Sequence, residues 1–70
     1  MPKLFSSREI VKVLENKGFA FVSQKGSHAK FFHIVRKLTV IVPANRKQIP
    51  SGTFSSILRQ SKLSRENFEK

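Results

Sequence analysis

The stretch FAFVSQKGSHAKFFHIVRKLTVIVP, residues 19–43, decides the fold. It is rich in aromatic and β-branched residues, which favour strands, and it contains two turn signals. Gly26-Ser27 matches the Gly-X pattern of a two-residue type II′ hairpin turn, and Arg36-Lys37 marks the next reversal. Pro43 ends the run because it cannot donate a hydrogen bond to a ladder. The expected strands are 19–24, 28–35 and 38–42. Connections this short require antiparallel neighbours, so we expect a three-stranded meander.

Helical signals flank these strands on both sides. Ser6 and Glu9 have the S-x-x-E spacing of a capping box, apolar residues then recur at helical spacing, and Gly18 supplies a left-handed end. The expected helical segments are 7–17, a second one from about residue 53, and a short third one around residues 64–68. The order α-β-β-β-α predicts an α+β fold, with two helices covering one face of a three-stranded antiparallel sheet and the other face open.

Length and composition describe one small domain over residues 1–70. We expect its core within about residues 6–64 and a C-terminal tail over 65–70. There is no cysteine, so disulfides and cysteine-ligated zinc are excluded, which fits the reducing cytoplasm that we expect as its location. No apolar run approaches the length of a membrane span, and we expect no membrane partner.

Charge is the most informative bulk property. Fourteen Lys and Arg face four acidic residues, which gives a formal net charge of +10. All four acids are glutamates, and residues 16–65 contain none of them. A uniformly positive potential attracts polyanions, so a nucleic acid or an acidic protein is the expected partner.

Side-chain alternation on the second strand sorts its residues between two faces. Ala29 and Phe31 suit the helix-covered face, which they share with His33. His28, Lys30 and Phe32 then point to the open face. The two histidines are five residues apart, so they lie on opposite faces and cannot share one metal ion.

The chain lacks the residues that most classes of hydrolytic enzyme need for catalysis. Two-metal nucleases and paired-carboxylate glycosidases need clustered acids, a serine triad needs Asp, and no Walker loop is present. RNA, however, carries its own nucleophile, the 2′-hydroxyl. A histidine that removes its proton, together with cations that stabilise charge on the phosphate, can cleave RNA without metal or cofactor. From the residues alone, His28 is either this group or an ordinary polar residue beside a turn.

Two segments together resemble a known family. QKGSHAKF (residues 24–31) followed by VIVPANRKQIPSGTFSSILRQSKLS (residues 40–64) resembles the HicA (YcfA-like) mRNA interferase toxins of type II toxin–antitoxin systems. The similarity runs from about Ser6 to Ser64. It is most specific in four short motifs, namely Lys25-Gly26-Ser27-His28, Val42-Pro43, Ile49-Pro50-x-Gly52-Thr53 and Ile57-Leu58-Arg59-Gln60.

The resemblance implies a fold like that of double-stranded-RNA-binding domains and an endoribonuclease that cleaves mRNA and arrests translation. It implies that His28 is the catalytic histidine. It also implies that a HicB-like antitoxin masks this residue and contacts operator DNA, which the toxin reaches only through the antitoxin. We expect the RNA to be bound by Lys25, Gly26, Ser27, Lys30, Arg46 and Lys47.

One departure from the family affects the segment after Pro43. Many members carry a histidine or a basic residue there, whereas this chain has Ala44 and Asn45, so any second role at that site is in doubt or shifts to Arg46. Two alternatives to a nuclease stay open at this stage. One is a non-catalytic RNA-binding module of the same fold, and the other is a basic adaptor for an acidic protein.

Overall fold

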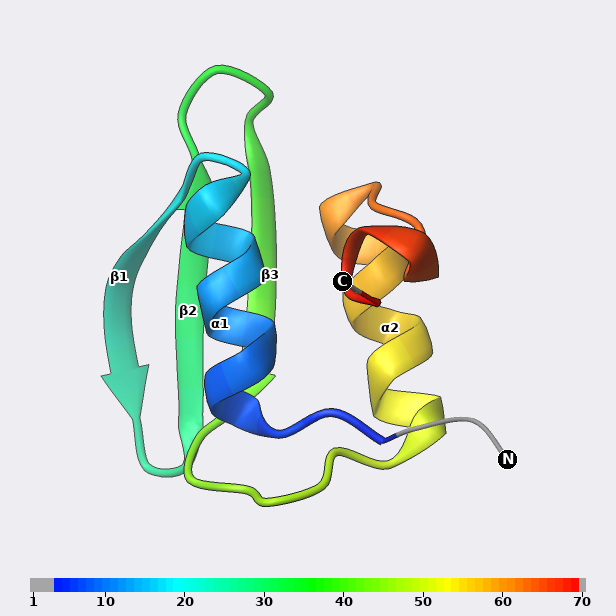
Figure 1. Cartoon of the computed structure of the whole chain (residues 1–70). Helices are drawn as coiled ribbons and strands as arrows, with labels where there is room; N and C mark the ends of the chain where they lie inside the picture. Colours follow the sequence, from blue (N-terminus) through cyan, green and yellow to red (C-terminus); the bar gives the residue numbers. More distant parts are fainter. Residues whose placement is uncertain (1–3, 70) are drawn as a thin grey trace.

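The elements follow the predicted order (Figure 1). The structure, a computed structural model, describes residues 4–69. Its elements are α1 (Ser7–Asn16), β1 (Phe19–Lys25), β2 (His28–His33), β3 (Leu38–Pro43), α2 (Ser51–Ser61) and the short 3₁₀ helix η1 (Arg65–Asn67). The strands form one antiparallel sheet in the order β1-β2-β3. This is an α+β fold like that of double-stranded-RNA-binding domains, as the sequence predicted.

The capping box fixes the start of α1. The Ser6 hydroxyl accepts a hydrogen bond from the Glu9 amide at 3.1 Å, and the Glu9 carboxylate accepts one from the Ser6 amide at 2.9 Å. The helix ends at Asn16, one residue earlier than predicted, because Lys17 already serves as its C-cap. Gly18 follows with a φ of +98°, which confirms the predicted left-handed end.

The two hairpins differ in how well the sequence predicted them. Gly26 has a φ of +60° and Lys25 pairs directly with His28, so the first turn has two residues, as expected. The prediction that the second strand extends to Val35 is wrong, because β2 ends at His33. His33 accepts hydrogen bonds there from two turn amides, that of Arg36 on Nδ1 and that of Lys37 on the carbonyl oxygen. These bonds begin the turn at His33, so the strand ends two residues earlier than predicted.

A β-bulge in β1 changes which side chains face the helices. Phe21 pairs with Phe31, whereas Ser23 pairs with Lys30, so Val22 is the extra residue between them. Because side chains alternate along a strand, the extra residue reverses the phase. Phe19 and Phe21 therefore lie on the helix-covered face, and Lys25 lies on the opposite face beside His28.

The hydrophobic core fills the space between the helices and one face of the sheet. Both helices contribute to it, and α1 crosses in front of the sheet in Figure 1. The sheet supplies Phe19, Ala29, Phe31, Val40 and Val42, and the helices supply Ile10, Leu14, Phe54 and Ile57. The opposite face of the sheet contributes no member of this core, so we call it the open face. It consists of Ala20, Ser23, Lys25, His28, Lys30, Phe32, Thr39, Ile41 and Pro43.

The C-terminal part of the chain packs more extensively than the sequence indicated. The second helix begins at Ser51 instead of near Thr53, because the Phe54 amide donates to the Pro50 carbonyl and closes the first turn there. The rings of Phe5 and Phe68 both pack against Phe54, at centroid distances of 5.1 and 5.2 Å. The packed core therefore extends beyond residues 6–64 at both ends.

Candidate nucleic-acid interface

His28 lies at the beginning of β2, where the open face meets the hairpin turn. Its partner across the sheet on one side is Lys25 and on the other side is Pro43. Directly opposed residues in a sheet have β-carbons about 5 Å apart, so the lysine and the histidine are close neighbours. Lys30 follows two residues along β2 on the same face. All three side chains are exposed to solvent. Alternation along the second strand predicted the open face for His28 and Lys30, whereas Lys25 lay outside the strand that the sequence predicted.

The Gly26-Ser27 turn borders this cluster and leaves space above it. The side-chain amide of Gln24 donates to the Gly26 carbonyl at 3.1 Å, and the Ala44 amide donates to the Ser27 carbonyl at 2.7 Å. These bonds fix the turn against the start of the loop that follows β3. A β-carbon at Gly26 would meet no other atom within 4 Å. A phosphate can therefore approach the turn backbone closely.

The open face carries positive charge only. The sequence places no carboxylate in any of the three strands, whereas Lys25 and Lys30 flank His28. Within residues 4–69, no three His, Cys, Asp or Glu side chains lie together in a group that can hold a metal ion. The arrangement favours an anion that lies across the face and contacts both lysines.

The second histidine has a structural role. His33 lies on the helix-covered face, where its ring packs edge-on against Phe19 at a centroid distance of 5.1 Å. Its Nδ1 atom accepts a hydrogen bond from the Arg36 amide at 3.1 Å. The two histidines are therefore on opposite sides of the sheet, as predicted, and only His28 belongs to the basic cluster.

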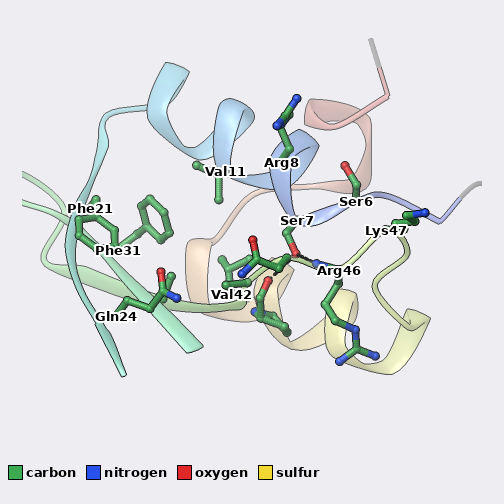
Figure 2. Close-up of a pocket in the computed structure, with 14 residues that line it drawn as sticks. Ser6, Ser7, Arg8, Val11, Phe21, Gln24, Phe31, Val42, Arg46 and Lys47 are labelled. Atoms are coloured by element: carbon green, nitrogen blue, oxygen red, sulfur yellow. Dashed lines mark hydrogen bonds between the residues drawn. The ribbon is translucent and has the colours of Figure 1, made fainter. Parts of the chain in front are cut away.

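The expected RNA-binding residues Arg46 and Lys47 lie on the other side of the sheet. They line a groove between the start of α1, the loop after β3, and the sheet (Figure 2). We call it the helix-side groove. Its apolar end contains Phe21, Phe31 and Val11, and its basic end contains the two cations. The structure thus groups Lys25, Gly26, Ser27 and Lys30 with His28 but separates Arg46 and Lys47 from it.

Ser7 holds the basic end of this groove in place, and sequence reasoning missed it. Its amide donates to the Arg46 carbonyl at 2.9 Å, and its hydroxyl accepts from the Arg46 amide at 2.9 Å. The same hydroxyl donates to the Pro43 carbonyl. These bonds attach Arg46 to α1. A serine beside an N-cap serine has no distinctive sequence pattern, so no signal in the chain could have revealed this role.

The family of this chain follows from comparison with known proteins. The chain matches the model of the HicA toxin of bacterial toxin–antitoxin systems over residues 7–63. This chain belongs to the HicA toxin family. The match includes α1, the whole sheet and α2, so it covers every residue of the open face. No curated protein matches the chain. Within residues 4–69, no helix of this HicA-family chain is long and apolar enough to cross a membrane.

Proposed function

We propose that this HicA-family chain is an endoribonuclease that cleaves mRNA and thereby arrests translation. The observation that carries the proposal is the exposed imidazole of His28 between Lys25 and Lys30 on a sheet face without carboxylates. A nuclease that uses the 2′-hydroxyl of its substrate needs a proton acceptor and nearby cations, and these three side chains supply both. Family membership supports the same activity.

In the proposed reaction, a neutral His28 imidazole takes the proton from the 2′-hydroxyl. The 2′-oxygen then forms a bond to phosphorus, and the bond from phosphorus to the 5′-oxygen breaks. Water or the protonated imidazole returns a proton to the leaving 5′-oxygen. Lys25 and Lys30 stabilise the negative charge that develops on the phosphate. The products are a 2′,3′-cyclic phosphate and a 5′-hydroxyl, and a positioned general base contributes about 10²- to 10⁴-fold to the rate.

We propose also that a HicB-like antitoxin neutralises this activity by covering the open face. The face is exposed and basic, so the matching surface of the antitoxin is acidic. Contact with operator DNA belongs to the antitoxin and involves the toxin only indirectly. Covering His28 prevents RNA from reaching it, which is sufficient for neutralisation.

The decisive experiment compares the two histidines under the same substitution. His28→Asn should reduce RNA cleavage by at least about 100-fold and abolish growth arrest, because the general base is lost. His33→Asn is the matched control, since its amide oxygen can replace the Nδ1 acceptor for the Arg36 amide. It should retain cleavage. The measurements are the cleavage rate of a single-stranded RNA, the end groups of the products, and circular dichroism to confirm folding.

Three outcomes would contradict the proposal. RNA binding without cleavage by the wild type at any protein concentration would make the chain a non-catalytic RNA-binding module. Products with a 3′-hydroxyl that form only in the presence of Mg²⁺ would exclude attack by the 2′-hydroxyl. Absence of RNA binding at physiological salt would leave an acidic protein as the partner of the basic face.

A further inference from the structure

Phe32 is a large apolar residue on the open face, where it is half-buried and lies outside the hydrophobic core. It lies in the middle of the sheet, between Ala20 on β1 and Thr39 on β3. Both neighbours are small and exposed, so neither can cover a phenyl ring. The ring stays partly accessible to solvent. A partly accessible aromatic ring on a basic face offers a surface on which a nucleobase can stack.

The position of Phe32 relative to His28 and Lys30 indicates which partner it binds. The three side chains follow one another at alternate positions of β2, so they project from the same face at steps of about 6.6 Å. One row therefore presents a proton acceptor, a cation and an aromatic ring in succession. A step of this size suits consecutive units of an extended nucleic-acid strand.

We propose that single-stranded RNA runs along β2 over the open face, with one nucleobase stacked on Phe32. The inference rests on the proposed function, because it places the scissile phosphate at His28. The phosphate next along the strand then meets Lys30. The stacked base lies about 13 Å from His28, which is about two nucleotides from the point of cleavage.

The charge of this face and its aromatic ring suit a nucleic-acid strand when the antitoxin is absent. The row contains a lysine, Lys25 stands beside it on β1, and the strands carry no carboxylate that would repel phosphate. Stacking on an aromatic ring tolerates every base, because every base has a π-face. It requires an unpaired base, so the proposed substrate is single-stranded. Phe32 is thus a positioning residue that binds substrate away from the reacting atoms.

The chain offers a clean spectroscopic test, because it contains neither tryptophan nor tyrosine. Phe32→Trp introduces a single indole on the open face. Binding of a single-stranded 2′-O-methyl RNA, which lacks the nucleophile and cannot be cleaved, should quench the fluorescence of this indole. The matched control is Phe21→Trp, because Phe21 is 55% exposed on the opposite face. Its fluorescence should change little.

The outcomes separate this inference from the proposed function. Quenching at position 32 supports stacking whether or not the wild type cleaves RNA. Cleavage by the wild type without quenching at position 32, or with quenching only at position 21, would overturn the inference and leave the nuclease proposal intact. Equal quenching by a duplex of the same sequence would overturn the single-stranded substrate.

A second variant keeps the test valid if the indole perturbs the sheet. Phe32→Leu keeps an apolar side chain on the face but removes the ring. It should weaken binding of the 2′-O-methyl RNA by about 5- to 150-fold. Its unfolding curve and circular dichroism should match those of the wild type. Unchanged RNA affinity in the folded variant would refute stacking at Phe32.

Discussion

Ser7 illustrates how one small side chain can satisfy two backbone groups that are distant in sequence. Its hydroxyl binds the Pro43 carbonyl and the Arg46 amide, and the residue is only 7% exposed. We predict that Ser7→Ala lowers the free energy of unfolding by about 1–3 kcal/mol, because two part-buried backbone groups lose their partner. Urea denaturation measures this loss.

Ser55→Ala is the control for the effect of the substitution itself. Ser55 is exposed on α2, and alanine is the better helix former, so stability should stay level or rise slightly. Equal urea denaturation curves for Ser7→Ala and the wild type would show that water replaces the hydroxyl at both backbone groups.

At the level of single residues, the sequence predicted the open face better than the groove. Alternation along one strand sufficed to place His28 and Lys30 together, because that rule is local. The roles of Ser7 and Gln60 depend on contacts across the fold. Gln60 accepts a hydrogen bond from the Ile41 amide at 3.0 Å and so satisfies an edge group of β3. No local pattern encodes such a pair.

The connection from α1 to β1 depends on Gly18, and the structure shows why. Its φ is +98°, and a β-carbon would lie 2.7 Å from His33 Nε2. We predict that Gly18→Ala lowers the free energy of unfolding by about 1–3 kcal/mol, since the strained backbone and the displaced imidazole both add cost. Thermal unfolding followed by circular dichroism measures the change.

Gly52→Ala is the control for Gly18→Ala, because it makes the same substitution inside a helix. Gly52 lies in the first turn of α2, and a β-carbon there would meet nothing within 4 Å. The substitution should raise stability by about 0.4–1 kcal/mol, because it restricts the unfolded chain. A loss of stability at this position would show that α2 needs the glycine for a reason other than space.

Whole elements were predicted from short-range signals, and the errors concern where a strand ends and which way its side chains face. The capping box and the glycine turn are local, and both were found as expected. The early end of β2 comes from two turn hydrogen bonds, one to the Nδ1 atom of His33 and one to its carbonyl oxygen. The bulge at Val22 left no local sign, because β1 is apolar on both faces and either phase fitted the sequence equally well.

For the whole molecule, the formal charge of +10 predicts strong but salt-sensitive RNA binding. We predict that the double variant Lys25→Gln/Lys30→Gln makes the slope of log affinity against log salt less negative by about 1.4, because each phosphate contact on a single strand contributes about 0.7. Filter binding of an uncleavable RNA across a salt series measures this slope.

Lys12→Gln/Lys17→Gln provides the charge-matched control. Both double variants have a formal charge of +8, which is the wild-type +10 less two lysines. The control lysines are exposed at α1, away from the open face, so they should leave the slope nearly unchanged. Equal slopes for the two variants would mean that RNA responds to net charge and not to the open face.

The fold class and the family were accessible from the sequence because they depend on element order and spaced motifs, which the structure and the family match both confirm. The separation of Arg46 from His28 was not accessible. Arg46 follows β3 closely in sequence, but its backbone is bound to α1. Its role in RNA binding stays a prediction.

The bulge in β1 also determines which length changes the strand can accept. A single-codon deletion at Val22 removes only the extra residue, so Phe21 keeps Phe31 as its partner and Lys25 keeps His28. The two side chains still face opposite ways, and the strand becomes regular. A second deletion between Phe21 and Lys25 has no extra residue left to remove, so the lysine must then enter the apolar layer or the aromatic ring must leave it. The gene can thus lose one codon here without damage to the protein, but not two.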